Sequence, residues 1–147
     1  MVSVMESKKI GPKEQLEQRI IDAPEEEYMN EEQLAFFKKK LIELHDITRE
    51  HIREAKEQML SPPDITDLSD KATWEEQCGM LIRIVEREQR LLPKIQQALE
   101  RIRIETYGYC LESGEPIGVR RLLARPTADF CADVKTMMEN KEHMYQK

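Results

Sequence analysis

The sequence predicts a mainly α protein in which a long antiparallel coiled-coil hairpin projects from a small globular module. Charged residues make up 35% of the 147 residues, aromatic residues make up 5%, and the chain has five glycines. This composition is typical of solvated helices and is poor for an all-β fold. Two long stretches with apolar residues at helical spacing, separated by a pair of prolines, predict the two arms of the hairpin.

The first arm is predicted to begin after Asn30, because Asn30 and Gln33 form a capping-box pattern. Apolar or small residues then recur at steps of three and four, with charged residues between them: Leu34, Phe37, Leu41, Leu44, Thr48, Ile52, Ala55 and Met59. The pattern predicts an amphipathic helix of roughly 30 residues and about 45 Å. Pro62 and Pro63 end this helix, because proline lacks a backbone donor and clashes with the preceding turn.

The second arm carries a heptad seam with alternating steps of four and three: Trp74, Cys78, Leu81, Val85, Glu88, Leu92, Ile95, Leu99 and Ile102. Two such helices joined by a short polar connector fold back on each other. The narrow stripe of each arm, without a third long helix to cover it, favours a projecting hairpin over two helices of an ordinary bundle. Pro93 interrupts the seam, so we expect a continuous helix kinked near 89–93, with a break into two helices as the competing outcome.

The segments around the arms complete the predicted organisation. Residues 1–30 are expected to carry a short helix that packs on the globular module. Residues 31–105 form the hairpin, with its tip near 62–72 and with Asp70 as the N-cap of the second arm. The glycines and prolines that follow predict a loop-rich module over 106–147, which closes with a C-terminal helix.

The C-terminal module contains half of a four-cysteine zinc pattern. Cysteines at positions 113 and 134 would complete the motif C-x2-C-x17-C-x2-C, but serine and valine stand there. We therefore expect a degenerate zinc-finger-like loop without metal, at positions Cys110, Ser113, Cys131 and Val134. Apolar packing is expected to hold the module together instead, through residues such as Leu111, Ile117, Leu122, Leu123, Phe130, Val134 and Met137.

Two charged groups are candidates for function. Asp64, Asp67 and Asp70 lie in the connector at the end of the hairpin, where carboxylates either keep the tip soluble or approach a metal ion or a basic surface. A basic group lies near the junction of the hairpin and the module: Lys94, Arg120, Arg121, Arg125 and Lys135. These residues are either ordinary surface cations or a pocket for a polyanion such as a nucleotide phosphate.

Several classes of function are disfavoured. The net charge of −6 argues against gripping nucleic acid through its phosphates, so we expect no sequence-specific DNA binding. The sequence has no nucleophile elbow, Gly-rich phosphate loop or paired-histidine metal motif, so we expect no enzyme. The first ten residues do not resemble a secretion signal, and no apolar run approaches the ~20 residues of a membrane span. We therefore expect a cytoplasmic protein with reduced cysteines that does not bind membranes.

Five segments together resemble the DksA/TraR family of bacterial transcription factors: 27–31, 67–72, 107–110, 117–122 and 124–129. The likeness covers roughly residues 25–140. The missing thiols at Ser113 and Val134 depart from the zinc-containing members. The chain therefore resembles a cysteine-depleted, zinc-independent member of the family.

The resemblance implies a monomer that inserts its hairpin into the secondary channel of RNA polymerase and destabilises open complexes at ribosomal RNA promoters. It implies that Asp67, Asp70 and Ala72 act at the tip, and that Arg87 faces outward and contacts the rim of the channel. It also implies a site for the alarmone ppGpp, formed together with polymerase, at the positions Leu91, Lys94, Arg125 and Lys135.

Two alternatives stay open. A Gre-type factor uses an acidic hairpin tip to hold Mg²⁺ and to stimulate cleavage of backtracked RNA. The pair Asp67 and Asp70 permits this chemistry, although the loop lacks adjacent carboxylates. A coiled-coil adaptor or homodimer would instead use the heptad seam to recruit another chain.

Overall fold

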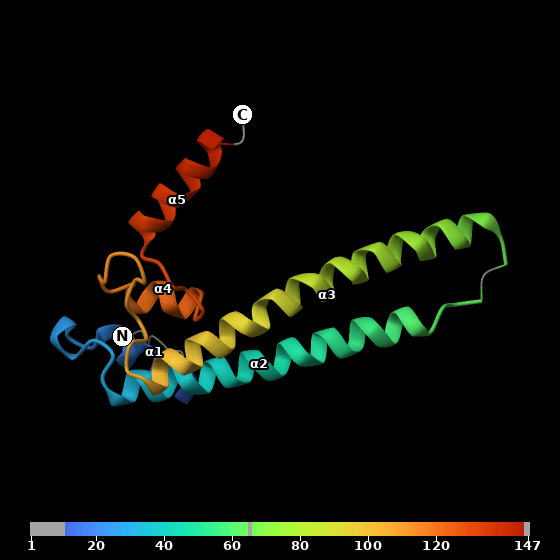
Figure 1. Ribbon diagram of the computed structural model, residues 1–147. Helices are drawn as coiled ribbons and strands as arrows, with labels where there is room; N and C mark the ends of the chain where they lie inside the picture. The colour runs from blue at the N-terminus through green and yellow to red at the C-terminus, as the bar shows by residue number, and fades with distance from the viewer. Residues whose placement is uncertain (1–10, 65, 146–147) are drawn as a thin grey trace, which may run out of the picture.

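The computed structural model describes residues 11–64 and 66–145. Within these ranges the elements are α1 (Pro12–Asp22), the 3-10 turn η1 (Glu25–Glu27), α2 (Glu31–Leu60), α3 (Leu68–Arg103), α4 (Val119–Ala124) and α5 (Ala132–Tyr145). The described part has no sheet, only an isolated antiparallel bridge between Tyr109 and Pro116. Figure 1 shows α2 and α3 extending as a hairpin, with α1 and α4 at its base and α5 projecting away from that end. The predicted mainly α fold with a projecting hairpin is confirmed.

The start of α2 has the predicted cap at Asn30, but the Gln33 side chain bonds to Met29, one residue before the position that a capping box requires. Asn30 Oδ1 accepts a bond from the Gln33 backbone N–H at 2.8 Å, and Gln33 Oε1 accepts one from the Met29 N–H at 2.6 Å. The first bond satisfies one of the backbone donors that a helix N-terminus leaves unpaired, and the second fixes the chain before the cap. Gln33 is buried, and its Nε2 donates to the Ile20 carbonyl at 3.0 Å. One glutamine therefore caps α2 and ties α1 to it.

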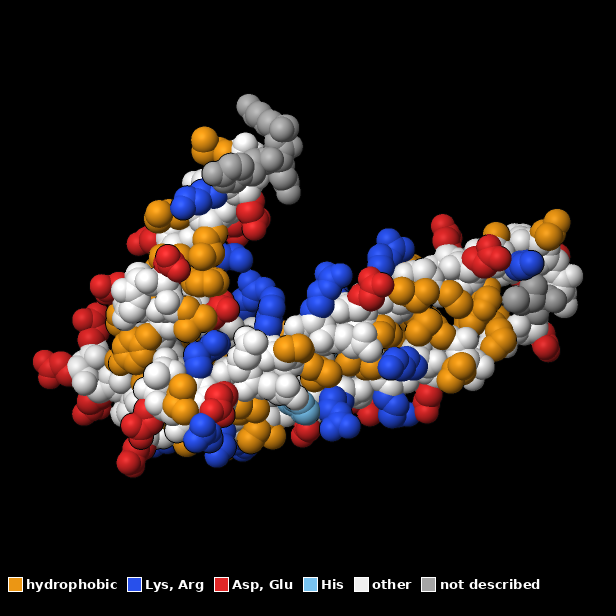
Figure 2. All heavy atoms as spheres, viewed as in Figure 1, with side chains coloured by type: hydrophobic (Ala, Val, Ile, Leu, Met, Phe, Trp, Pro, Cys, Tyr) orange, Lys and Arg blue, Asp and Glu red, His pale blue; other side chains and the backbone are white. Residues whose placement is uncertain are grey.

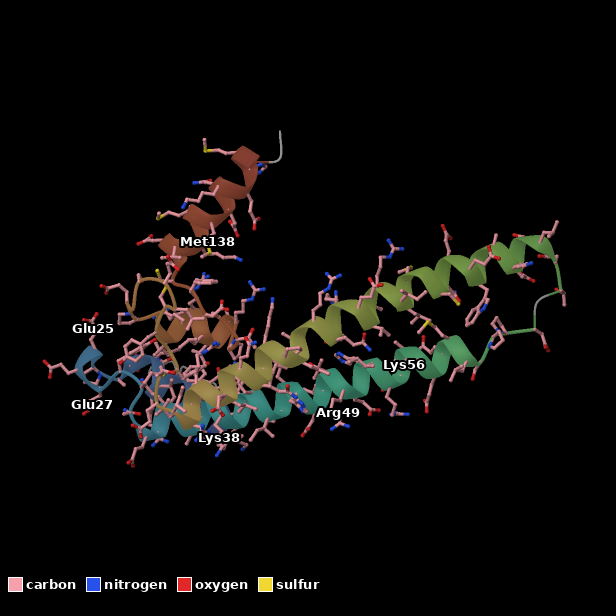
Figure 3. The ribbon with its side chains drawn as sticks, viewed as in Figure 1. Glu25, Glu27, Lys38, Arg49, Lys56 and Met138 are labelled. Atoms are coloured by element: carbon pink, nitrogen blue, oxygen red, sulfur yellow. The ribbon has the colours of Figure 1, made fainter. Side chains whose placement is uncertain are left out.

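The two arms bury the predicted seam only in part, because its distal positions, such as Met59, Trp74 and Leu81, are half-buried. The buried residues on α2 are Gln33, Phe37, Leu41, Thr48, Ile52 and Ala55, and those on α3 are Val85, Glu88, Ile95 and Ala98. Lys38, Arg49 and Lys56 are exposed along α2 (Figure 3). No described residue between positions 56 and 84 is buried. The distal half of the hairpin therefore consists of two paired helices without further cover.

Pro93 lies inside α3, which runs without interruption from Leu68 to Arg103 (Figure 1). The predicted continuous helix is confirmed, and the alternative of a break is wrong. Proline removes one backbone hydrogen bond. Buried seam residues on both sides of it, Val85 and Ile95, pack against α2 and hold the helix together. The kink near 89–93 stays a prediction.

The base of the hairpin shares one core with the C-terminal module. Its buried members are Ile20, Phe37, Leu41, Ile95, Ala98, Tyr107, Cys110, Ile117, Leu122 and Ala128. Ile117 and Leu122 are in this core as expected, but Leu111 is 58% exposed and Met137 60% exposed, so their predicted burial is wrong. Tyr107 fills the interior instead, where its hydroxyl donates to the Pro126 carbonyl at 2.7 Å.

The hydroxyl of Tyr28 joins the N-terminal segment to the module. It donates to the Gly108 carbonyl at 2.5 Å and accepts from the Gly118 N–H at 3.0 Å. Gly108 has a φ of +94°, and a Cβ at this position would lie 2.7 Å from Met29 Cγ. Glycine is therefore required here both by the backbone conformation and by the close approach of the N-terminal segment.

None of the helices in the described ranges is both long enough and apolar enough to cross a membrane. Residues 1–10, the first third of the predicted N-terminal segment 1–30, lie outside the described residues.

Candidate functional site

The free end of the hairpin presents its two aspartates at the start of α3. Asp67 is the N-cap, and its Oδ1 accepts from the Asp70 backbone N–H at 2.8 Å. Asp70 lies in the first turn, where its Oδ2 accepts from Thr66 Oγ1 at 3.2 Å. The prediction that Asp70 is the N-cap is therefore wrong. Asp67 caps the helix instead, so α3 begins three residues earlier than predicted. Asp67, Asp70 and Ala72 are all exposed.

Arg87 extends from the middle of α3 into solvent. Its side chain is 75% exposed, which confirms that it faces outward beside the seam residue Glu88. Glu88 is buried in the seam, and its Oε1 lies 3.5 Å from both Arg87 Nη2 and His51 Nδ1. The long Arg87 side chain is thus available to a partner that approaches the side of the hairpin.

A basic recess of about 50 Å³ lies between α3, α4 and α5. Its lining residues are Lys94, Arg121, Arg125, Thr127, Ala128, Asp129, Phe130 and Lys135. Figure 2 shows Lys and Arg side chains gathered in the hollow between α3 and the C-terminal helices. The structure therefore brings together Lys94, Arg125 and Lys135, which the sequence separates widely. Leu91 does not line the recess; it is half-buried and packs on the core beside it.

The charges of the basic recess favour an anion. Four cations and one carboxylate, Asp129, line it. None of the four cations forms an ion pair in the described part of the chain. Four clustered cations beside a single carboxylate create a local positive potential even in a chain with a net charge of −6. Guanidinium and ammonium groups in such a cluster form charge-assisted hydrogen bonds with phosphate oxygens.

Sequence reasoning did not identify Thr127 and Asp129 as residues of this recess. Both lie in the irregular segment between α4 and α5, where helical spacing gives no information about side-chain direction. Arg120, by contrast, belongs to the basic group of the sequence but is exposed and does not line the recess.

The residues of the degenerate zinc positions come together only in part. The Ser113 backbone N–H donates to Cys110 Sγ at 3.5 Å, and Ser113 Oγ lies 3.7 Å from Cys131 Sγ. Burial by itself raises the pKa of the Cys110 thiol. Hydrogen bonds from the Ser113 hydroxyl and from neighbouring backbone groups have the opposite and larger combined effect, so the pKa is lowered to about 6. Val134 is half-buried and packs on the apolar core.

This donor set does not fit structural zinc. Zinc in such sites has four tetrahedral ligands, whereas these positions provide two thiols, one hydroxyl and one alkyl group. No group of three or more His, Cys, Asp or Glu in the described ranges is placed to hold a metal ion.

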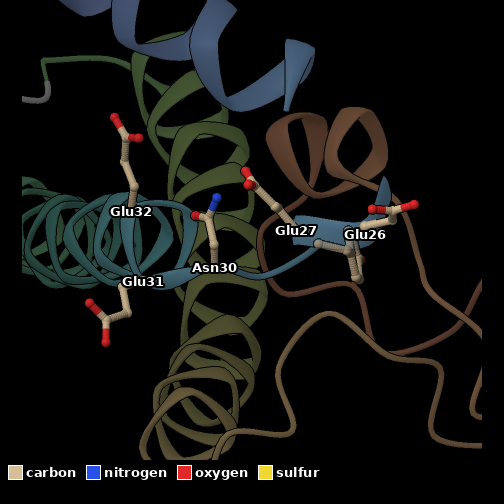
Figure 4. Close-up of a pocket in the computed structure, with 6 residues that line it drawn as sticks. Glu26, Glu27, Asn30, Glu31 and Glu32 are labelled. Carbon is tan, nitrogen blue, oxygen red and sulfur yellow. The ribbon is translucent and has the colours of Figure 1, made fainter. Parts of the chain in front are cut away.

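An acidic depression of about 540 Å³ surrounds the start of α2 (Figure 4). Its lining residues are Glu26, Glu27, Tyr28, Asn30, Glu31 and Glu32. Glu31 and Glu32 lie in the first turn, where carboxylates stabilise the positive end of the helix dipole. Glu32 also pairs with Arg19 at 2.9 Å, so this acidic group has a structural explanation.

Comparisons with known proteins place the chain among transcription factors. A family model described as DnaK suppressor protein DksA, N-terminal domain, matches residues 33–102, and one described as prokaryotic dksA/traR C4-type zinc finger matches residues 105–136. The RNA polymerase-binding transcription factor DksA of Haemophilus influenzae is 42% identical over 119 residues, which are 80% of this chain and 82% of that protein. The chain belongs to the DksA/TraR family. As a member of this family of transcription factors, it is not an enzyme.

Other DksA proteins agree with this assignment. The Escherichia coli RNA polymerase-binding transcription factor DksA is 39% identical over 122 residues, which are 82% of this chain and 81% of that protein. The solved structure of transcription factor DksA2 from Pseudomonas aeruginosa matches with a TM-score of 0.75 and 39% identity. That match covers 86% of this chain and 98% of the Pseudomonas chain. The C4-type zinc-finger model thus matches residues 105–136 of this chain, although only two of the four cysteines, Cys110 and Cys131, are present there.

Proposed function

We propose that this protein binds RNA polymerase through the secondary channel, destabilises open complexes at ribosomal RNA-type promoters and acts together with ppGpp, without requiring zinc. The observation that carries the proposal is the free hairpin end, which presents Asp67 and Asp70 on two paired helices of 30 and 36 residues. The shorter helix alone gives a reach of about 45 Å. Relatives at 39–42% identity are named RNA polymerase-binding transcription factors.

In this proposal the hairpin, residues 31–105, enters the channel, while the N-terminal segment and residues 106–147 stay at its rim. Asp67, Asp70 and Ala72 act at the inserted end, and the exposed Arg87 contacts the rim. The protein acts as a monomer and in the cytoplasm, where polymerase is located.

The proposed ppGpp site consists of Leu91, Lys94, Arg125 and Lys135. Three of these residues line the basic recess, which supports the assignment. The recess of about 50 Å³ is far smaller than the ~300 Å³ or more of pockets that enclose a small molecule. It therefore holds phosphate groups of the nucleotide, while polymerase contacts the remainder.

Zinc independence is supported by the donor set and by the way the module is held. Two thiols do not complete a tetrahedral site. The buried Tyr107 and the Tyr28 hydroxyl bridge hold the same loop through packing and hydrogen bonds.

The tip assignment is tested with Asp70→Asn and Ala72→Thr. We expect both variants to bind polymerase but to lose inhibition of a ribosomal RNA promoter in transcription with purified components, because the change lies at the inserted end and away from Arg87. Asp64→Asn is the matched control, since Asp64 is exposed in the connector outside the family motif. Full inhibition by both tip variants would reject the assignment, and factor-dependent shortening of backtracked RNA would favour the Gre-type alternative.

A further inference from the structure

Arg121 occupies a distinctive place in the basic recess. Its Nε donates to the Phe130 carbonyl at 3.1 Å, and the side chain lines the recess together with Lys94, Arg125 and Lys135. The Nη groups have no hydrogen-bond or ion-pair partner within the described chain. One edge of the guanidinium is therefore held by the protein, while its other donors are left for a ligand.

We propose that Arg121 is a fourth phosphate-binding cation of this recess, and that it also positions Lys135. This inference rests on the proposed ppGpp site and extends it by a residue outside the family positions carried over above. A nucleotide with a pyrophosphate group at two positions offers many phosphate oxygens to the donors of a cationic recess. A guanidinium binds such oxygens through two parallel N–H donors, which an ammonium cannot do.

The positioning role follows from the chain path after Phe130. The Arg121–Phe130 bond joins α4 to the residues immediately before α5, which begins at Ala132. The Lys135 backbone N–H donates to the Cys131 carbonyl at 3.0 Å, so the first turn of α5 is built on that same segment. Because the Phe130 carbonyl is held in place, the start of α5 is fixed, and with it the position of Lys135 on the side of the recess opposite Lys94.

The chain offers a matched control next to Arg121. Arg120 has the same charge and lies on the same short helix, α4, but is exposed and outside the recess. The experiment compares Arg121→Gln, Arg121→Lys, Arg120→Gln and Lys94→Ala. For each variant the ppGpp concentration that gives half of the maximal effect on a ribosomal RNA promoter is measured with purified polymerase at two salt concentrations. Thermal unfolding of each variant reports whether it folds.

We expect Arg121→Gln to raise the half-maximal ppGpp concentration by about tenfold, the loss of one charge-assisted contact. The response of this variant should also depend less on salt, which a purely structural role would not change. Arg121→Lys should recover part of the loss, because the charge returns without the paired donors. Arg120→Gln should match the natural protein.

The outcomes separate this inference from the function on which it rests. If Lys94→Ala loses the ppGpp response while Arg121→Gln keeps it, the role of Arg121 is overturned and the proposed site stands. If neither variant changes the response, the site itself is misplaced. An equal loss in Arg120→Gln and Arg121→Gln would show that only the net charge of α4 matters, which also overturns the specific role of Arg121.

Discussion

At the scale of single residues, one tyrosine hydroxyl forms a bond within the C-terminal module, and a second joins the N-terminal segment to that module. Tyr107 is buried and donates to Pro126, while Tyr28 bridges Gly108 and Gly118 and packs edge-on against Tyr109 with ring centroids 5.5 Å apart. Burial raises the pKa of both the Tyr28 and the Tyr107 hydroxyl above the ordinary value. The folded protein therefore favours their neutral forms.

This shift predicts a loss of stability at high pH. Below about pH 10 both tyrosines are neutral in the folded and the unfolded chain, and their contribution to stability is complete. As the pH rises above this value, only the unfolded chain ionises readily, so the free energy of unfolding falls. Urea unfolding at increasing pH measures the decline, and Tyr107→Phe should reduce it. Tyr109→Phe, at an exposed ring, is the control, and an equal effect of both variants would contradict the assignment.

At the scale of elements, α3 has a well-defined start but few buried contacts in the half nearest the tip. Asp67 caps its start, and the seam continues past Pro93. The distal half of this helix, however, contains Gly79, and none of its residues from position 68 to position 84 is buried. Glycine in a helix interior costs about 1 kcal/mol relative to alanine. This helix is therefore expected to be least stable in the part nearest the tip of the hairpin.

Gly79→Ala is expected to stabilise the hairpin by up to about 1 kcal/mol. A Cβ at this position would meet only Arg83 Nη2, at an ordinary contact distance of 3.9 Å, so the substitution introduces no clash. Urea unfolding followed by helical circular dichroism measures the change. Gly118→Ala is the contrasting variant, because its φ of +102° disfavours any side chain and should make it destabilising. A destabilised Gly79→Ala would show that packing near the tip is tighter than the structure indicates.

At the scale of the whole molecule, one apolar core joins α1, the base of both arms and the C-terminal module. Cys110 belongs to this core, so one thiol of the degenerate zinc positions lies among apolar side chains. The basic recess lies against this core, where α3, α4 and α5 meet. The positions of its cations therefore depend on how the complete base is packed.

The proposal of zinc independence predicts that the purified protein contains much less than one zinc per chain. A zinc chelator should change neither its unfolding temperature nor its inhibition of a ribosomal RNA promoter. The double substitution Ser113→Cys with Val134→Cys restores four thiols and should bind one zinc per chain, because Ser113 already lies beside Cys110 and Cys131. Stoichiometric zinc in the natural chain, with unfolding on chelation, would reject zinc independence.

The sequence by itself determined the hairpin. Asn30 and Gln33, the two spaced apolar stripes and the proline pair specify helices through contacts within a few residues, and they predicted α2 and α3. Tertiary structure alone decided the base: the burial of Tyr107, the exposure of Leu111, and a recess that includes Asp129 but not Arg120. Helical periodicity is a local property, whereas the path of a loop-rich module depends on long-range packing that spacing along the chain does not encode.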